Sequence, residues 1–211
     1  GDQENVDESV PYSDRWLCHY PHTKALAEQQ VLGANSEALS TCALKEKSTM
    51  HTIEDARRAQ DLGAVGLQVS PPLQNDPTQD DMLRYFEAIS DAIDIGIMVY
   101  HTYWMPGGRI EVDPIVKMAD FEQVAAIKWS TPEVEDYDEM RQFSHIFNVI
   151  DNSGQAVRCH RNGGRGTVSA FAPAYAADEL KVWDLVESGR YEQAQKLEDR
   201  ISSALGPVRA R

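Results

Sequence analysis

Beyond about residue 49, short apolar runs alternate with segments of helical periodicity, and this alternation limits the fold more than any other feature. The apolar runs predict strands at 65–69, 95–100, 124–129, 147–151 and 167–171. Helical spacing predicts helices at 53–62, 80–93, 114–119, 135–143, 177–188 and 191–205. Parallel strands need a crossover connection, and these helices supply it. The predicted fold class is therefore α/β, either a (β/α)8 barrel or an open doubly wound sheet.

The first 48 residues differ in character from the rest. A polar stretch rich in Asp and Glu precedes a predicted helix at 22–32 and a predicted strand at 39–44. The polar break Lys-Glu-Lys-Ser follows at 45–48. We predict two parts on this basis, residues 1–48 and residues 49–211. The strand at 39–44 is suited to lie beside the strand at 65–69.

The charge of the chain disfavours several partners. With 34 acidic and 20 basic residues the formal net charge is -14, which repels nucleic acids and anionic membrane surfaces. No run approaches the ~20 apolar residues of a membrane helix, and the acidic first residues are unlike a signal peptide. Three cysteines without CxxC spacing favour neither a disulfide framework nor a zinc site. We expect a soluble cytoplasmic protein without a bound metal.

Two of the predicted strands end on residues that suit imine chemistry. One apolar run ends on Lys128, and the preceding run ends on Tyr100, one strand–helix unit earlier. Apolar surroundings lower the pKa of a lysine and free a neutral amine for attack on a ketone. Neighbouring parallel strands lie ~4.8 Å apart, so both side chains can reach one point at the C-terminal face, where Tyr100 can move protons. The alternative is that Lys128 snorkels into water and Tyr100 caps the core.

The chain from about residue 50 to 211 resembles the dihydrodipicolinate synthase/N-acetylneuraminate lyase family of class I aldolases and lyases. The matching segments keep that family's order and spacing and lie at 52–64, 66–72, 77–78, 88–92, 126–130, 152–154, 163–166, 168–169 and 187–191. The resemblance implies a (β/α)8 barrel followed by C-terminal helices and assembled as a dimer or tetramer. It also implies that Lys128 is the Schiff-base lysine and Tyr100 the proton-transfer tyrosine, with no cofactor.

Two departures from the family bear on the substrate. The family's early strands, including a Gly-Thr-Thr-Gly-Glu loop that contacts the substrate carboxylate, have no counterpart, so we expect a partial barrel that lacks its first strands. The arginine after the tyrosine in the synthase branch is also absent, since 103–106 read Tyr-Trp-Met-Pro. We therefore expect a lyase, aldolase or dehydratase acting on a 2-oxo acid such as pyruvate, with low turnover. We predict that His101, Trp104, Ser153 and Gly154 bind this substrate, and that open strand edges favour a homo-oligomer.

The N-terminal part carries a motif of its own. The four-residue spacing of Tyr20 and Lys24 places both on one face of a helix, where the ammonium lowers the pKa of the phenol. Together with segments 7–12, 19–29 and 39–44 the motif resembles an extended short-chain dehydrogenase of the 3β-hydroxysteroid type. The Gly-rich dinucleotide loop of that family has no counterpart, so we predict a vestigial motif in a chimeric chain. Two alternatives stay open: an NAD(P)-dependent oxidoreductase of that dehydrogenase type and a non-catalytic structural module.

Overall fold

The computed structural model describes residues 41–44, 48–72, 76–131, 134–169 and 172–209. Contacts within the chain divide it into two compact units, Gly1–Ser40 and Thr41–Arg211. The fold described below is that of the second unit. The predicted helix at 22–32 and the motif residues Tyr20 and Lys24 lie outside the described residues.

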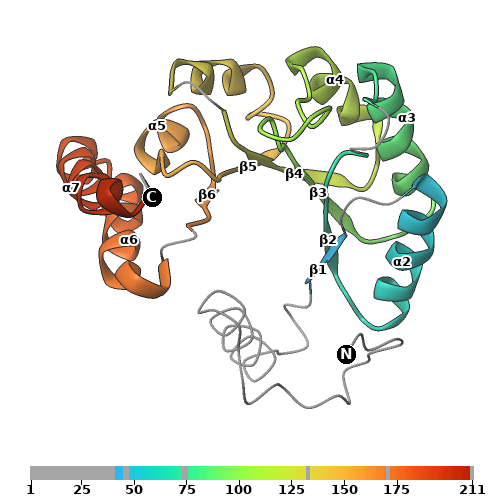
Figure 1. Cartoon of the computed structure of the whole chain (residues 1–211), viewed down its shortest axis with the longest axis horizontal. Coiled ribbons are helices and arrows are strands. Elements are labelled where there is room, and N and C mark those ends of the chain that lie inside the picture. The colour runs from blue at the N-terminus through green and yellow to red at the C-terminus, as the bar shows by residue number, and fades with distance from the viewer. Residues whose placement is uncertain (1–40, 45–47, 73–75, 132–133, 170–171, 210–211) are drawn as a thin grey trace. The chain divides into compact units, whose positions relative to one another are not determined.

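The second unit is built on a parallel sheet of six strands (Figure 1). In chain order these are β1 (Thr41–Leu44), β2 (Gly66–Val69), β3 (Gly96–Tyr100), β4 (Val124–Trp129), β5 (Asn148–Asp151) and β6 (Gly166–Thr167). Each strand pairs in parallel with the next one in the sequence. A doubly wound sheet reverses its strand order at a switch point, whereas a barrel winds in one direction. The observed order is therefore that of a (β/α) barrel.

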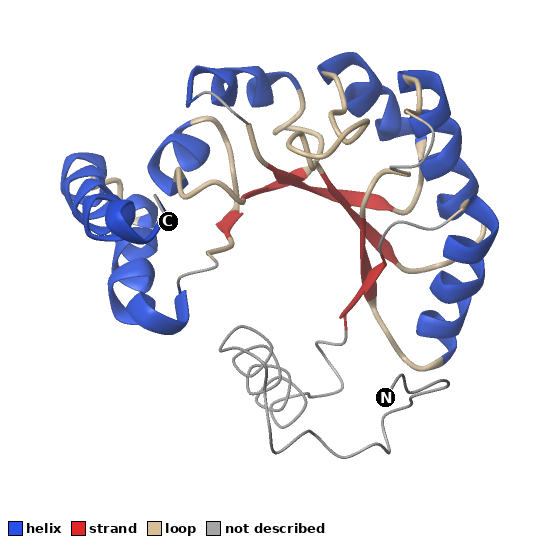
Figure 2. Cartoon of the chain, viewed as in Figure 1, coloured by secondary structure: helices blue, strands red, loops and turns tan. Residues whose placement is uncertain are grey.

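The sheet curves, and helices lie on its outer face (Figure 2). They are α2 (Thr49–Asp61), α3 (Gln79–Ser90), α4 (Val112–Lys117), the 3-10 helices η1 (Met118–Asp120) and η2 (Val134–Gln142), and α5 (Ala156–Arg161). Beyond β6, the helices α6 (Ala172–Glu187) and α7 (Tyr191–Arg209) pack against each other. The strand predicted at 39–44 is confirmed within its described part, since β1 pairs with β2 along its whole length.

Side-chain caps in the sequence fix where two of the outer helices begin. The Ser48 hydroxyl accepts a hydrogen bond from the backbone N–H of His51 at the start of α2 (3.4 Å). Thr78 and Asp81 form a capping box at α3, in which each side chain accepts a hydrogen bond from the backbone N–H of the other residue. A cap of this kind stabilises a helix by about 1 kcal/mol.

The α-helix predicted at 135–143 is wrong in type, because this segment forms the 3-10 helix η2. Its apolar side chains explain the difference. Tyr137, Met140 and Phe143 follow one another at intervals of three and are all fully buried. Three residues per turn is the period of a 3-10 helix, so this spacing keeps all three side chains on the face that packs against the sheet.

Two further predictions are corrected between β5 and α6. Helix α5 was not predicted, because six residues with several basic side chains are too few to show a helical period. The strand predicted at 167–171 is shorter in the structure, where β6 covers only Gly166–Thr167 and residues 168–169 follow outside the sheet. Residues 170–171 lie outside the described residues.

The two faces of the sheet differ in their side chains. Alternate strand residues such as Leu67, Val69, Ile97 and Val99 are buried and join the apolar side chains of the outer helices in the main core. The residues between them, such as Gly66, Gln68, Gly96 and Met98, are less buried and lie on the inner face. A cavity of about 380 Å³ on this face is lined by these four residues together with Ala43, Leu67, Ile97, Ala125 and Ala126.

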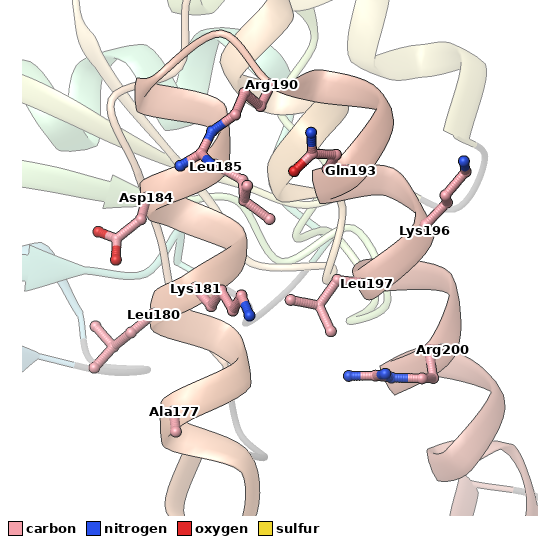
Figure 3. Close-up of a pocket in the computed structure, with 10 residues that line it drawn as sticks. All are labelled: Ala177, Leu180, Lys181, Asp184, Leu185, Arg190, Gln193, Lys196, Leu197 and Arg200. Atoms are coloured by element: carbon pink, nitrogen blue, oxygen red, sulfur yellow. The ribbon is translucent and has the colours of Figure 1, made fainter.

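A second apolar cluster holds α5, α6 and α7 together. A groove of about 750 Å³ runs between α6 and α7 (Figure 3). Four of its lining side chains are cationic, namely Lys181, Arg190, Lys196 and Arg200. Within the part of the chain that the structure describes, no helix is both long enough and apolar enough to cross a membrane.

Candidate active site

Tyr100 and Lys128 are register partners at the C-terminal ends of β3 and β4. The Lys128 Nζ atom lies 4.1 Å from the centroid of the Tyr100 ring. At this distance a cation is attracted by the negative face of the ring. The structure therefore brings together the two side chains that were predicted from the strand ends.

A β-bulge in β4 places Lys128 on the same face as Tyr100. Between the pairs Ile97–Val124 and Tyr100–Lys128, β4 has one residue more than β3. Val124 is buried in the core that the outer helices cover. With regular alternation from Val124, the Lys128 side chain would point into that helix layer, because side chains two residues apart share a face. The extra residue reverses this and turns the lysine inward.

The Lys128 amine is hydrogen-bonded to a residue that lines the inner-face cavity. Its Nζ atom donates a hydrogen bond to Oε1 of Gln68 on β2 (3.1 Å), and Gln68 lines the cavity. The lysine is only 9% exposed. The amine is thus held by side chains from β2 and β3.

The Tyr100 hydroxyl contacts a residue that follows β5, two strands away from β3 in the sheet. The Asn152 side chain follows β5, and its Nδ2 atom lies 3.4 Å from the Tyr100 hydroxyl oxygen. The same Nδ2 atom donates to Oγ of Ser130 (2.9 Å), the residue that follows β4. Three consecutive strands therefore contribute to the surroundings of the tyrosine.

The turn that carries Asn152 is fixed by the buried carboxylate of Asp151. This carboxylate accepts hydrogen bonds from the backbone N–H groups of Ser153 and Gln155 (both 3.0 Å) and from the hydroxyls of Thr167 (2.9 Å) and Tyr137. Burial, followed by the negative charge of Asp151, raises the pKa of Tyr137 well above its usual value. Tyr137 therefore stays protonated and remains a hydrogen-bond donor to Asp151.

Comparison with known families assigns most of the chain. Residues 45–205 match the sequence model of the Dihydrodipicolinate synthetase family. The chain belongs to this family. The resemblance expected from the motifs between residues 50 and 211 is confirmed.

Individual members of the Dihydrodipicolinate synthetase family have low sequence identity to this chain. It is 27% identical over 162 residues to the 4-hydroxy-tetrahydrodipicolinate synthase of Gluconacetobacter diazotrophicus, a match that covers 74% of this chain and 54% of that protein. It is 23% identical over 169 residues to the enzyme of the same name from Staphylococcus haemolyticus, covering 76% of this chain and 58% of that protein. The chain thus spans little more than half the length of these relatives.

Solved structures of family members share the fold. The dihydrodipicolinate synthase of Thermotoga maritima superimposes with a TM-score of 0.75 and 22% identity, covering 90% of this chain and 65% of that chain. The chloride-inhibited dihydrodipicolinate synthase of Acinetobacter baumannii, complexed with pyruvate, superimposes with a TM-score of 0.76 and 22% identity, covering 89% and 65%. The parallel six-stranded sheet is therefore the arrangement found in this family's barrels.

The N-terminal residues match a different family. Residues 2–51 match the sequence model of the 3-beta hydroxysteroid dehydrogenase/isomerase family. This match overlaps the Dihydrodipicolinate synthetase match at residues 45–51.

Two of the four predicted substrate-binding residues, Trp104 and His101, lie in different surroundings. Trp104 lies beside Tyr100, with ring centroids 5.8 Å apart in an edge-to-face arrangement, and is half exposed. His101 is buried instead, stacked on Trp129 at 4.5 Å, and its Nδ1 atom lies 2.6 Å from the carbonyl oxygen of Ser130. Burial lowers the pKa of His101 to about 4, so Nδ1 carries the proton of a neutral ring and donates it to that carbonyl.

Ser153 and Gly154 form the turn after β5. Ser153 is tied by its backbone N–H to Asp151, and Gly154 has a φ of 71°, the left-handed conformation that glycine adopts without strain. Both follow Asn152, which contacts Tyr100. The roles of His101, Trp104, Ser153 and Gly154 in binding a substrate stay predictions.

Sequence reasoning missed three side chains at this site, namely Gln68, Ser130 and Asn152. Each lies at or near the C-terminal end of a strand, as do Tyr100 and Lys128. Position at strand ends was the signal available for them, because a parallel sheet gathers such residues at one edge. Among the described residues, no group of three or more His, Cys, Asp or Glu side chains is placed to hold a metal ion.

Proposed function

We propose that this chain acts as a Schiff-base lyase or aldolase on a 2-oxo acid such as pyruvate, with Lys128 as the nucleophile and Tyr100 as the proton-transfer group. The observation that supports this most is the 4.1 Å approach of Lys128 Nζ to the Tyr100 ring at neighbouring strand ends. Barrels of this class build their active sites at the C-terminal ends of the strands. The pyruvate in the Acinetobacter baumannii structure supports the choice of ligand.

The chemistry needs an amine and a group that can give and take a proton. The Lys128 nitrogen bonds to C2 of the 2-oxo acid, and the C2 oxygen leaves as water after it has taken up protons. Loss of a C3 proton from the imine then gives an enamine, which can form a new carbon–carbon bond. We assign these proton transfers to the Tyr100 hydroxyl, because Tyr100 and Lys128 lie against each other at neighbouring strand ends.

We further propose that the site prefers a monocarboxylate with an apolar or aromatic portion. Trp104 lies edge-on to Tyr100 and exposes half of its surface, which offers a stacking surface to such a group. The arginine expected of a dicarboxylate-handling synthase is replaced by the Tyr-Trp-Met-Pro run. Residues 1–211 contain no counterpart of the hydroxyl-bearing loop of the family, so we expect these residues by themselves to bind the substrate carboxylate weakly and to turn over slowly.

Reductive trapping with a panel of acids tests the proposal. The chain is incubated with pyruvate, phenylpyruvate or 2-oxoglutarate, reduced with borohydride and weighed by intact mass spectrometry. We expect adducts with the two monocarboxylates, little with 2-oxoglutarate, and none in Lys128→Arg. Trp104→Ala should lower the yield with phenylpyruvate more than with pyruvate. Absence of any adduct would favour the non-catalytic alternative.

For residues 1–48 we propose a fragment related to short-chain dehydrogenases, in which Tyr20 and Lys24 are vestigial. The match at residues 2–51 supports this origin. A helix N-terminus with a Gly-rich loop normally holds the dinucleotide pyrophosphate, and residues 1–48 themselves contain no such loop. Titration with NAD and NADP by calorimetry should show no saturable binding, and micromolar binding would restore the oxidoreductase alternative.

A further inference from the structure

The hydroxyl of Tyr100 has a partner that can only donate. The lone pair of an amide nitrogen is delocalised into the carbonyl group, so Asn152 Nδ2, 3.4 Å away, donates a hydrogen bond to the phenol oxygen and cannot accept one from it. The phenol's own proton therefore stays available for transfer. When that proton has left, the same N–H group faces a phenolate, and hydrogen bonds to charged groups are the stronger ones.

Asn152 is held at two points, one in its backbone and one in its side chain. Its backbone N–H donates to the carbonyl oxygen of Trp129 (2.9 Å), and its Nδ2 atom donates to Oγ of Ser130 (2.9 Å). Ser130 is fully buried, and its carbonyl oxygen accepts the hydrogen bond from His101. The amide is thus oriented before any substrate arrives, which removes the entropy cost of ordering it during the reaction.

We infer that Asn152 is a positioning residue for Tyr100, with Ser130 as its anchor. One Nδ2 hydrogen bonds to Ser130 and the other to Tyr100. The serine thereby orients the amide, and the amide orients the phenol and stabilises it when it is ionised. This inference rests on the proposed function, because it assigns a role in the proton transfers that accompany imine formation at Lys128. It adds β5 to the strands that supply active-site groups.

Kinetics of reductive trapping test the role. For Asn152→Ala we expect the trapping rate at saturating pyruvate to fall roughly 10- to 100-fold, the loss of one hydrogen bond to a charged group. The pyruvate concentration at half-saturation should change by less than about 2-fold, because we assign Asn152 to the tyrosine and give it no part in binding the substrate. Asn152→Ser keeps a donor and should recover part of the rate. Ser130→Ala should have a smaller effect in the same direction.

Asn148→Ala is the matched control, since Asn148 is an exposed asparagine at the opposite end of β5. Its trapping rate should equal that of the unaltered chain. If Asn152→Ala leaves the saturating rate unchanged, or changes only the half-saturation concentration, the positioning role is wrong. Thermal unfolding of each variant shows whether a lost rate reflects a lost fold, in which case Asn152→Ser must still recover the rate for the inference to stand.

A measurement without substrate separates this inference from the proposed function. In a chain labelled with 13C at the tyrosine Cζ, the Tyr100 signal is assigned by its loss in Tyr100→Phe. Asn152→Ala should move this signal, and Asn148→Ala should leave it in place. An unmoved signal would show that the contact does not exist. If the signal moves but the unaltered chain forms no adduct with pyruvate, the proposed function fails, and the catalytic role of Asn152 fails with it.

Discussion

At the scale of single residues, the candidate site is made by side chains that contact one another across neighbouring strands. Tyr100 and Lys128 face each other on the inner side of the sheet, while His101 lies buried against Trp129. Tyr100 and His101, which are adjacent in the sequence, therefore contribute to different parts of the structure. Tyr100 belongs to the proposed reaction site, and His101 ties β3 to the carbonyl oxygen of Ser130 beyond the end of β4.

Replacing Tyr100 by phenylalanine should slow imine trapping by ~10²- to 10⁴-fold, which is the usual contribution of a positioned acid–base group. The fold should persist, because the ring and its contact with Trp104 remain. Rates of borohydride trapping with pyruvate measure the effect. Tyr103→Phe, in the loop that follows, is the control and should trap at the normal rate. Equal rates for all three chains would exclude Tyr100 as the proton-transfer group.

His101 should make the chain sensitive to acid. Burial lowers its pKa from 6.5 to about 4, so the unfolded chain binds a proton more readily than the folded one. Its contribution to stability is therefore present above pH 6.5 and is lost as the pH falls towards 4, by at most about 3 kcal/mol. In His101→Gln the free energy of unfolding should depend less on pH in this window. His145→Gln, at an exposed histidine, should keep the normal dependence.

At the scale of elements, the strands could be predicted and their irregularities could not. The apolar runs at 95–100 and 124–129 mark β3 and β4 and give Tyr100 and Lys128 as strand ends. The bulge that turns Lys128 inward has no mark in the sequence, because it depends on how β4 pairs with β3. The contact of Asn152 with Tyr100 likewise depends on the order of three strands, which periodicity alone leaves open.

The packing of α7 against α5 should weaken as the pH rises. Glu198 of α7 accepts a hydrogen bond from the backbone N–H of Val157 in α5 (3.2 Å), and burial is the main cause that raises its pKa from 4.5 to about 7. The folded chain therefore holds this proton more tightly than the unfolded one. Stability is greatest below pH 4.5 for this group and is lost as the pH rises through 7, by at most about 3 kcal/mol.

Glu198→Gln tests this expectation, since glutamine keeps an acceptor oxygen without the charge. By urea unfolding, the variant should match the unaltered chain at pH 4.5 and exceed it in stability at pH 8. Glu192→Gln, at an exposed position of the same helix, should show no such difference. A stability advantage for Glu198→Gln that does not grow with pH would contradict the burial of a titrating carboxyl.

At the scale of the whole molecule, the described sheet has six strands in barrel order, with β1 and β6 at its two ends. The edge of β2 is covered by β1, as the placing of the strand at 39–44 beside the strand at 65–69 predicted. Strand edges carry backbone groups that invite pairing with another chain. We therefore propose that the chain self-associates through the ends of this sheet.

Light scattering over a range of concentrations should show a mass above that of one chain. Hydrogen exchange in the same samples should show amides of residues 41–44 and 166–167 that become more protected as the concentration rises. A monomer at all concentrations, with both strands already protected, would contradict association through the sheet edges.

The most direct measurement of the central claim is the site of the pyruvate adduct. After incubation with pyruvate and borohydride, the chain is digested and every lysine-containing peptide is quantified by mass spectrometry. Lys128 lies against Tyr100 and is hydrogen-bonded to Gln68, so we predict that the adduct is found on Lys128 and disappears in Lys128→Arg. Labelling spread over Lys24, Lys117 and Lys181 as readily as over Lys128, or no labelling, would contradict it.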